Sequence, residues 1–154
     1  MDTDTRIVID TSVVLDIMLA TRSRHSDAKE IGKYIINSGL KVRMPMRGMF
    51  EIMCATVNVK IDAISKDQEL KGTDAVTEEK PLSFDPVPID MQFLNDYFDP
   101  SIPYIKASDL IFISLAKREG AALITEDDKM YNVAKESNVN VYRIKESMDS
   151  FARS

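Results

Sequence analysis

The chain has 154 residues, which suffices for one domain with its own hydrophobic core, and its single cysteine, Cys54, excludes an intrachain disulfide. Acidic residues outnumber basic ones by 25 to 20, a net charge of −5 that argues against broad nucleic-acid binding but allows a nuclease with a carboxylate metal site. The start, MDTDTR, lacks a signal peptide's positive charge, and no apolar run could span a bilayer. We therefore expect a cytoplasmic protein with a single domain over residues 1–154.

Strands and helices alternate along the first half of the chain. Residues 6–10 (RIVID) form an apolar run with β-branched side chains, which predicts a buried strand, and Ser12 is the expected N-cap of the helix that follows. A helix over 26–38 should end at Gly39, before a second strand, LKVRMP. A long helix is expected from 47 to 64, with Cys54 as a small core residue.

The second half begins with a polar stretch over 65–85, which we interpret as a loop or mobile segment. LSFDPVPID is predicted to be an extended segment interrupted by prolines, which is consistent with an edge strand, and Asp90 should cap the short helix after it. A helix over 106–120 (KASDLIFISLAKREG) ends at a glycine, and AALIT, EDDKMYNVAKES and VNVYRI predict a strand, a helix and a final strand. The alternation predicts an α/β fold with a mostly parallel sheet.

Four acidic residues stand at positions where side chains meet in such a fold. Asp10 and Asp127 each follow a buried strand, and the carboxyl ends of parallel strands are where sites form. Glu51 and Asp109 lie in the first turns of helices, beside small or apolar residues that make an unpaired charge costly. Clustered carboxylates repel one another and are stabilised by a divalent cation, and oxygen-only ligands favour Mg²⁺ or Mn²⁺. Such an ion activates water for attack on a phosphodiester.

Each of these acids also has a structural interpretation, at a turn or at a helix start. In TEDD, Thr125 and Asp128 match a capping box, so we expect Asp128 to be structural and Asp127 to be the ligand candidate. Asp16 is expected on a solvated helix face. His25 is the only histidine, which excludes a paired-histidine ribonuclease within one chain, and we expect it at the surface.

Taken in order, these motifs resemble the PIN domain and, within it, the VapC-like toxins of toxin–antitoxin pairs. The matching stretches are VIDTSVVLDI, MRGMFEIMCA, IKASDLIFISLAKREGAALIT and TEDDKMYNVAK. The resemblance implies a three-layer α/β/α fold around a mostly parallel sheet, with Mg²⁺ or Mn²⁺ held at Asp10, Glu51, Asp109 and Asp127. Ser12 and Thr125 fall where hydroxyls of the family orient ligands or metal-bound water.

The resemblance further implies an endoribonuclease that hydrolyses RNA, is a homodimer and is held inactive by an antitoxin, as in type II toxin–antitoxin pairs. The chain departs from the shortest toxins in its polar 65–85 stretch and in its DPVP and DPSIP segments. Basic residues near the acids are the expected contacts to phosphates of the flanking RNA, and the candidates are Arg22, Arg24 and Arg47. The apolar surface of the 47–64 helix is a candidate dimer or antitoxin contact.

Of two other functions, a non-catalytic binding module stays open and a phosphohydrolase is disfavoured. A degenerate PIN domain would bind RNA or protein without cleaving it. A phosphohydrolase with an aspartyl nucleophile at Asp10 would need a second acid two residues later, where the chain has Ser12. Stacking on aromatic rings is one way to bind the bases of single-stranded RNA, but the sequence places neither Tyr104 nor Tyr131 at the site.

Overall fold

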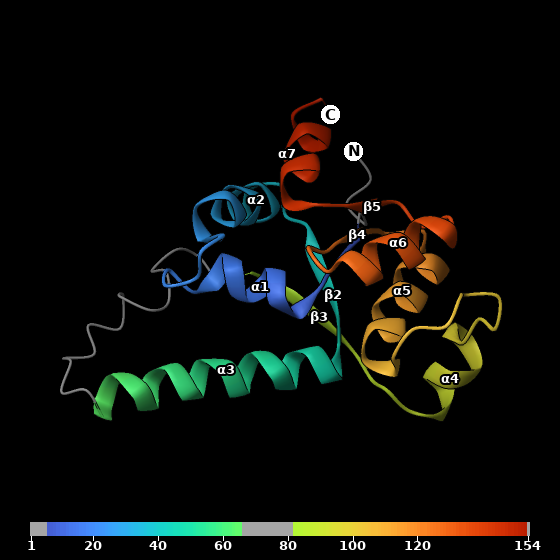
Figure 1. Ribbon diagram of the computed structural model, residues 1–154, viewed down its shortest axis with the longest axis horizontal. Coiled ribbons are helices and arrows are strands. Elements are labelled where there is room, and N and C mark those ends of the chain that lie inside the picture. The colour runs from blue at the N-terminus through green and yellow to red at the C-terminus, as the bar shows by residue number, and fades with distance from the viewer. Residues whose placement is uncertain (1–5, 66–81, 154) are drawn as a thin grey trace.

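The computed structural model describes residues 6–65 and 82–153, with side chains described outside 57–65 and 152. Within this part of the chain, five strands form one all-parallel sheet in the order β3-β2-β1-β4-β5. The strands are β1 (Arg6–Ile9), β2 (Lys41–Pro45), β3 (Phe84–Val87), β4 (Ala122–Ile124) and β5 (Val141–Tyr142). Figure 1 shows the sheet running through the middle of the molecule.

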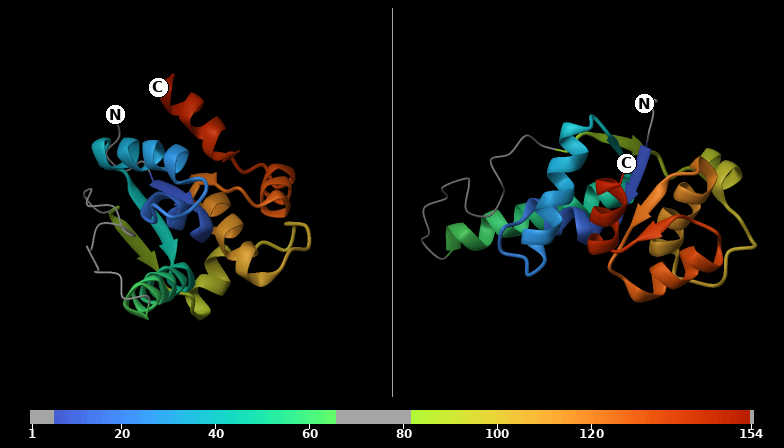
Figure 2. Two further views of the ribbon diagram at one scale, coloured as in Figure 1. Left: turned by 60° about the vertical axis from the view of Figure 1, so that its left-hand side comes forward. Right: turned by 90° about the horizontal axis from the view of Figure 1, so that it is seen from above.

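Helices cover both faces of this sheet, as the views in Figure 2 show. One face carries α1 (Thr11–Met18), α2 (His25–Asn37) and α7 (Ile144–Ala152), and the other carries α5 (Ala107–Glu119) and α6 (Asp128–Glu136). Helix α4 (Met91–Tyr97) packs on α5, and α3 (Met46–Ser65) starts at the end of β2 and contacts α1. The predicted three-layer α/β/α fold is therefore confirmed. None of the described helices is both long and apolar enough to cross a membrane.

Strand β1 lies at the centre of the sheet because its residues can be buried on both sides. Ile7, Val8 and Ile9 are at most 2% exposed, as expected of a parallel strand covered by helices on both faces. Val8 is paired with Arg43 of β2 on one side and with Leu123 of β4 on the other. The segment predicted to be an edge strand forms β3, which lies at the edge of the sheet. Pro86 has no amide hydrogen to donate, and an edge strand tolerates this because one of its sides has no neighbouring strand.

The predicted helix ends are confirmed where glycine or aspartate sets them. Gly39 and Gly120 have φ angles of 67° and 62°, the left-handed conformation that terminates a helix at little steric cost. Asp90 caps α4, since its carboxylate accepts a hydrogen bond from the amide of Phe93 at 2.9 Å.

Helix α7 was not predicted, and the last strand is shorter than VNVYRI. Ile144 and Ser147 are buried, and the Phe151 ring stacks on Tyr34 of α2 with a centroid distance of 4.5 Å. The side chain of Glu146 closes a capping box on the backbone of Arg143. The stacking of Phe151 depends on α2 lying alongside, and the sequence of this short helix does not show that neighbour.

Helix α3 forms as predicted, but its core-facing side does not include Cys54. Ile52 is 5% exposed and Gly48 is buried, whereas Phe50 and Met53 are 69% and 61% exposed. The prediction that Cys54 is a core residue is wrong, because its side chain is exposed. A spacing of three to four residues identifies an apolar stripe but not the side on which the rest of the protein lies.

The expected 65–85 loop falls largely outside the described residues, which resume at Leu82. Leu82 is buried, and β3 already begins at Phe84. The expected loop therefore extends too far at its carboxyl end, because Phe84 pairs with Val42 in the sheet.

Candidate functional site

Asp10 leaves the carboxyl end of the central strand and lies between two hydroxyl groups. Its side chain is 9% exposed, and one oxygen, Oδ2, accepts hydrogen bonds from Ser12 Oγ and Thr125 Oγ1, each at 3.1 Å. The predicted N-cap role of Ser12 is wrong, because Asp10 occupies the N-cap position of α1 and Ser12 lies in the first turn. Ser12 instead helps to orient the carboxylate.

The surroundings of Asp10 act against its negative charge. Burial raises the pKa of the Asp10 carboxyl, and the hydrogen bonds from Ser12 and Thr125 offset part of this rise. The charges of Asp109 and Asp127 raise the same pKa further, which places both carboxylates within electrostatic reach of Asp10. Asp10, Asp109 and Asp127 are therefore electrostatic neighbours at the carboxyl edge of the sheet, where β1 and β4 end side by side.

Asp109 lies in the first turn of α5, with a side chain that is 13% exposed. Burial raises the pKa of the Asp109 carboxyl, and the charges of Asp127 and Glu51 add to the rise. Lys106 acts the other way, because its Nζ atom lies 3.6 Å from Asp109 Oδ2. The fourth predicted acid, Glu51, is thus electrically coupled to the group through Asp109.

Asp127 caps a helix, a role that the sequence analysis assigns to Thr125. It is the N-cap of α6, where its Oδ1 atom accepts a hydrogen bond from the amide of Met130 at 2.7 Å. The predicted capping role of Thr125 is wrong, since its hydroxyl oxygen accepts a bond from the Asp127 amide and its hydroxyl donates to Asp10. Asp128 is ion-paired with Arg143 at 2.6 Å, in agreement with the prediction that it is structural.

The four carboxylates influence one another but do not converge on one point. Among the described residues, no three Asp, Glu, His or Cys side chains are arranged to hold a metal ion as they stand. Three of the acids have other partners. Asp127 caps α6, Asp109 is paired with Lys106, and Glu51 accepts a hydrogen bond from Arg47 at 3.0 Å. The donor set nevertheless suits Mg²⁺ or Mn²⁺, because it consists of oxygens and a cation would relieve the burial of charge at Asp10.

The prediction that Asp16 lies on a solvated face is wrong. Asp16 is 2% exposed, and its two carboxylate oxygens accept hydrogen bonds from Arg22 Nε at 2.7 Å and Arg24 Nε at 2.9 Å. The loop after α1 folds back and buries this carboxylate beneath the two guanidinium groups. The signal that could have revealed it is an acid followed six and eight residues later by arginines.

Both arginines lie close to the acidic residues. Arg22 Nη2 donates to the carbonyl oxygen of Ser12 at 3.3 Å, beside Asp10. The negative charges of Glu126 and Asp10 contribute to a raised pKa of the Arg24 guanidinium, behind the larger effect of its hydrogen bond to Asp16. The third predicted phosphate contact, Arg47, is paired with Glu51, as described above.

Two other residues that can carry positive charge, Arg43 and His25, have partners away from the acidic edge. Arg43 forms two ion pairs, with Glu119 at 2.6 Å and Asp85 at 3.2 Å, and belongs to the packing between the sheet and α5. His25 is half-buried, and its Nδ1 atom lies 2.8 Å from the Asp16 carbonyl oxygen. It therefore supports the loop after α1.

Comparison with known families decides how this acidic edge should be classified. A model of the PIN domain matches residues 7–136, a range that includes all four acids. The chain belongs to the PIN-domain family. PIN domains form a nuclease superfamily whose members are generally hydrolases that use divalent metal ions.

Two further comparisons add little to this classification. The chain is similar to a domain of a functionally unknown protein from Methanocaldococcus jannaschii DSM 2661, with 14% identity, 90% of each chain covered and a TM-score of 0.47. No curated protein matches this PIN domain.

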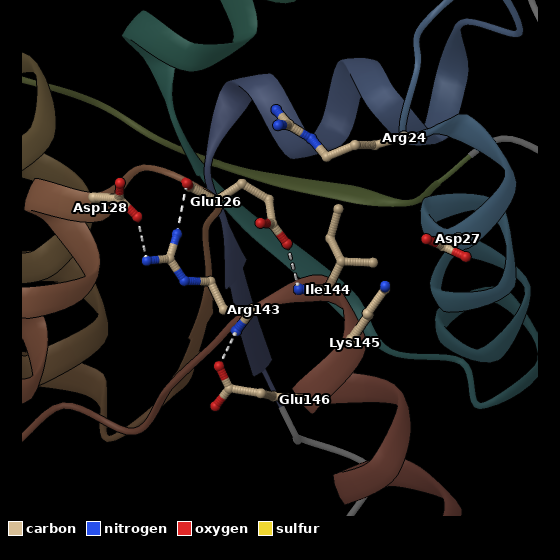
Figure 3. Close-up of a pocket in the computed structure, with 8 residues that line it drawn as sticks. All are labelled: Arg24, Asp27, Glu126, Asp128, Arg143, Ile144, Lys145 and Glu146. Carbon is tan, nitrogen blue, oxygen red and sulfur yellow. Dashed lines mark hydrogen bonds and ion pairs between the residues drawn. The ribbon is translucent and has the colours of Figure 1, made fainter.

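A cavity of about 620 Å³ opens beside the acidic edge of the PIN domain (Figure 3). It lies between the start of α2, the 126–128 segment and the start of α7, and Arg24 and Glu126 line it. Glu126 accepts a hydrogen bond from the Ile144 amide at 2.7 Å, and Arg143 donates to the Glu126 carbonyl oxygen at 2.6 Å. Helix α7, which lies beyond the matched region, thus holds the segment that carries Asp127.

Proposed function

We propose that this PIN domain is a metal-dependent endoribonuclease and the toxin of a VapC-like, type II toxin–antitoxin pair acting in the cytoplasm. The observation that carries the proposal is the buried Asp10 carboxylate, which two hydroxyls orient and which Asp109 and Asp127 approach closely enough to raise its pKa. A structural turn residue needs neither burial nor like-charged neighbours. Buried carboxylates with raised pKa values, at the open edge of a parallel sheet, are typical of functional sites.

In this proposal four carboxylates bind Mg²⁺ or Mn²⁺, namely Asp10, Glu51, Asp109 and Asp127. When bound, such an ion lowers the pKa of a coordinated water and neutralises charge on the phosphodiester. Asp109 has a second role, which is to orient the attacking water. Ser12 and Thr125 keep Asp10 in one orientation.

The neighbouring cations are proposed to bind the RNA backbone. Arg22 and Arg24 stand beside the acids, and the Arg22 bond to the Ser12 carbonyl brings the nearer guanidinium close to Asp10. Arg47 precedes Glu51 by one helical turn. Contacts of this kind position the flanking phosphates while the acidic centre acts on the scissile one.

The experiment that tests the proposal measures cleavage of single-stranded RNA with and without Mn²⁺. The parent protein should cleave only with the metal, and Asp10→Asn should abolish cleavage while the protein stays folded. Asp128→Asn is the matched control. It removes a negative charge next to Asp127, but Asp128 is ion-paired with Arg143 and is not one of the four proposed metal ligands. Equal cleavage by parent and Asp10→Asn, or none by a folded parent with metal, would contradict the proposal.

A binding module without catalysis is the second candidate, and one observation favours it. Among the described residues, three of the four acids are engaged by a helix cap or a basic side chain and no three-ligand group is formed. This candidate predicts RNA binding that is unchanged by Asp10→Asn and by Mn²⁺. The cleavage experiment therefore separates the two.

The homodimer and the antitoxin remain part of the proposal. Helix α3 exposes Met46, Phe50 and Met53, which line an apolar cavity of about 530 Å³ together with Met49. Large apolar surface of this kind is common at protein contacts. Light scattering that shows a single monomeric species would remove the homodimer from the proposal.

A further inference from the structure

Tyr104 is the most exposed of the large aromatic and apolar side chains described in the structure. Its exposed fraction is 89%, against 69% for Phe50 and Met91, which come next. The residue lies on the segment between α4 and α5, directly ahead of the helix that carries Asp109. A tyrosine ring with this exposure is open to contact with a ligand.

The segment that carries Tyr104 is held firmly on both sides of the ring. Ile102 and Ile105 are 8% and 4% exposed, so the chain is anchored in the core two residues before Tyr104 and one residue after it. Asp99 fixes the start of the segment through a 2.7 Å ion pair with Lys117 and a 2.9 Å hydrogen bond from the amide of Ser101. The ring is therefore exposed on a preorganised support and not on a loose loop.

Two lysines place the ring at the rim of the acidic edge. Lys129 Nζ lies 5.7 Å from the centroid of the Tyr104 ring, and Lys129 stands in the first turn of α6, two residues after the cap Asp127. Lys106 follows Tyr104 by two residues and contacts Asp109. The ring thus lies where α5 and α6 both begin, at the end of the molecule that carries these two acids.

We propose that Tyr104 is the platform on which one base of a single-stranded RNA stacks, with Lys106 and Lys129 beside the adjoining phosphates. The inference rests on the proposed function, because it assumes that the acidic edge acts on RNA. An exposed ring provides a stacking surface for any base, and basic groups next to it bind the backbone of the same strand. Stacking on this ring positions the strand relative to the acids that begin the two helices.

The other tyrosine considered for stacking is not available. Tyr131 is 9% exposed, and its ring is covered by Arg143 at 4.3 Å and Lys135 at 4.7 Å. Its hydroxyl group donates to Glu146 at 3.0 Å. Tyr131 therefore belongs to the packing between α6 and α7, and the choice between the two rings follows from their surroundings.

The test uses the full chain with Asp10→Asn as the background and a single-stranded oligoribonucleotide that contains 2-aminopurine. Stacking quenches 2-aminopurine fluorescence, and the absence of tryptophan from the chain leaves that signal clear. Tyr104→Ala should abolish the quenching and raise Kd about 5- to 150-fold, the effect of losing one base–aromatic stack. Tyr104→Phe keeps the ring and should stay within about twofold of the background protein. Phe98→Ala, the control at a 54% exposed ring, should also stay within about twofold.

Unchanged quenching and Kd in Tyr104→Ala would overturn the inference, and so would equal losses in Tyr104→Ala and Tyr104→Phe. The Tyr104 variants in the parent background give an independent reading, where KM for RNA should rise in Tyr104→Ala while kcat is kept. Because the fluorescence measurement needs no catalysis, it remains decisive if the parent cleaves nothing. If Tyr104→Ala loses the quenching and the parent does not cleave RNA, the stacking role of Tyr104 is supported and the proposed nuclease activity is rejected.

Discussion

Replacement of Asp16 by alanine should destabilise the protein by about 2–3 kcal/mol. The carboxylate is 2% exposed and accepts charge-assisted hydrogen bonds from Arg22 and Arg24. Loss of one partner in a fully buried ion pair costs about 3–5 kcal/mol, because the remaining charge stays unpaired. Here the side chains of Arg22 and Arg24 are 34% and 47% exposed, so both guanidinium groups can regain water and the cost falls below that range.

The assay is urea-induced unfolding followed by circular dichroism, with the midpoint and the slope fitted separately. Asp16→Ala should lower the midpoint at an unchanged slope, and Asp16→Asn should lose less because the amide oxygen still accepts one hydrogen bond. Asp27→Ala is the control, since Asp27 is an exposed acid in the first turn of α2 and its loss should cost less than about 1 kcal/mol. A midpoint for Asp16→Ala equal to that of the parent would refute the reasoning that the buried carboxylate stabilises the loop after α1.

Two further predictions concern the acidic edge and the core. Asp10→Asn should raise the free energy of unfolding at neutral pH, because a carboxyl whose pKa is raised by burial opposes folding when it is ionised. The stability gained by Asp10→Asn should shrink as the pH falls through the folded-state pKa of Asp10, because the parent carboxyl then becomes protonated as well. Urea unfolding of both proteins at neutral and at acidic pH measures this difference. A less stable Asp10→Asn at neutral pH would contradict the effect of burial. Ile52→Ala, at a side chain 5% exposed, should cost about 2–4 kcal/mol, whereas Phe50→Ala, at 69% exposed, should stay within about 0.5 kcal/mol; equal losses in thermal unfolding would contradict the assignment of the buried face of α3.

Local patterns were sufficient where a short stretch decides its own structure. The apolar run before Asp10 is buried on both sides, so it became the central strand β1. Gly39 and Gly120 end their helices because a positive φ angle strains residues with a Cβ atom, and Asp90 caps α4 with its own carboxylate. Each of these outcomes depends on a few consecutive residues.

The wrong predictions concern side chains whose environment is created by distant segments. Asp16 looked solvated because a helix face shows no sign of the two arginines that fold over it from the next loop. Cys54 looked buried because its neighbours are apolar, although Ile52 is the residue that faces the core. Helix α7 was missed because its apolar residues pack against α2, more than a hundred residues earlier in the chain.

The sequence by itself determined the order of strands and helices as far as the last strand and singled out four acids as candidates, because the period of apolar residues and the ends of strands are local properties. Only the tertiary structure decided which groups surround them. Asp127 caps α6, Thr125 binds Asp10, and Tyr104 stands exposed at the rim while Tyr131 is covered. The physical reason is that a parallel sheet brings together chain segments more than a hundred residues apart, and the pKa and exposure of a side chain depend on those neighbours.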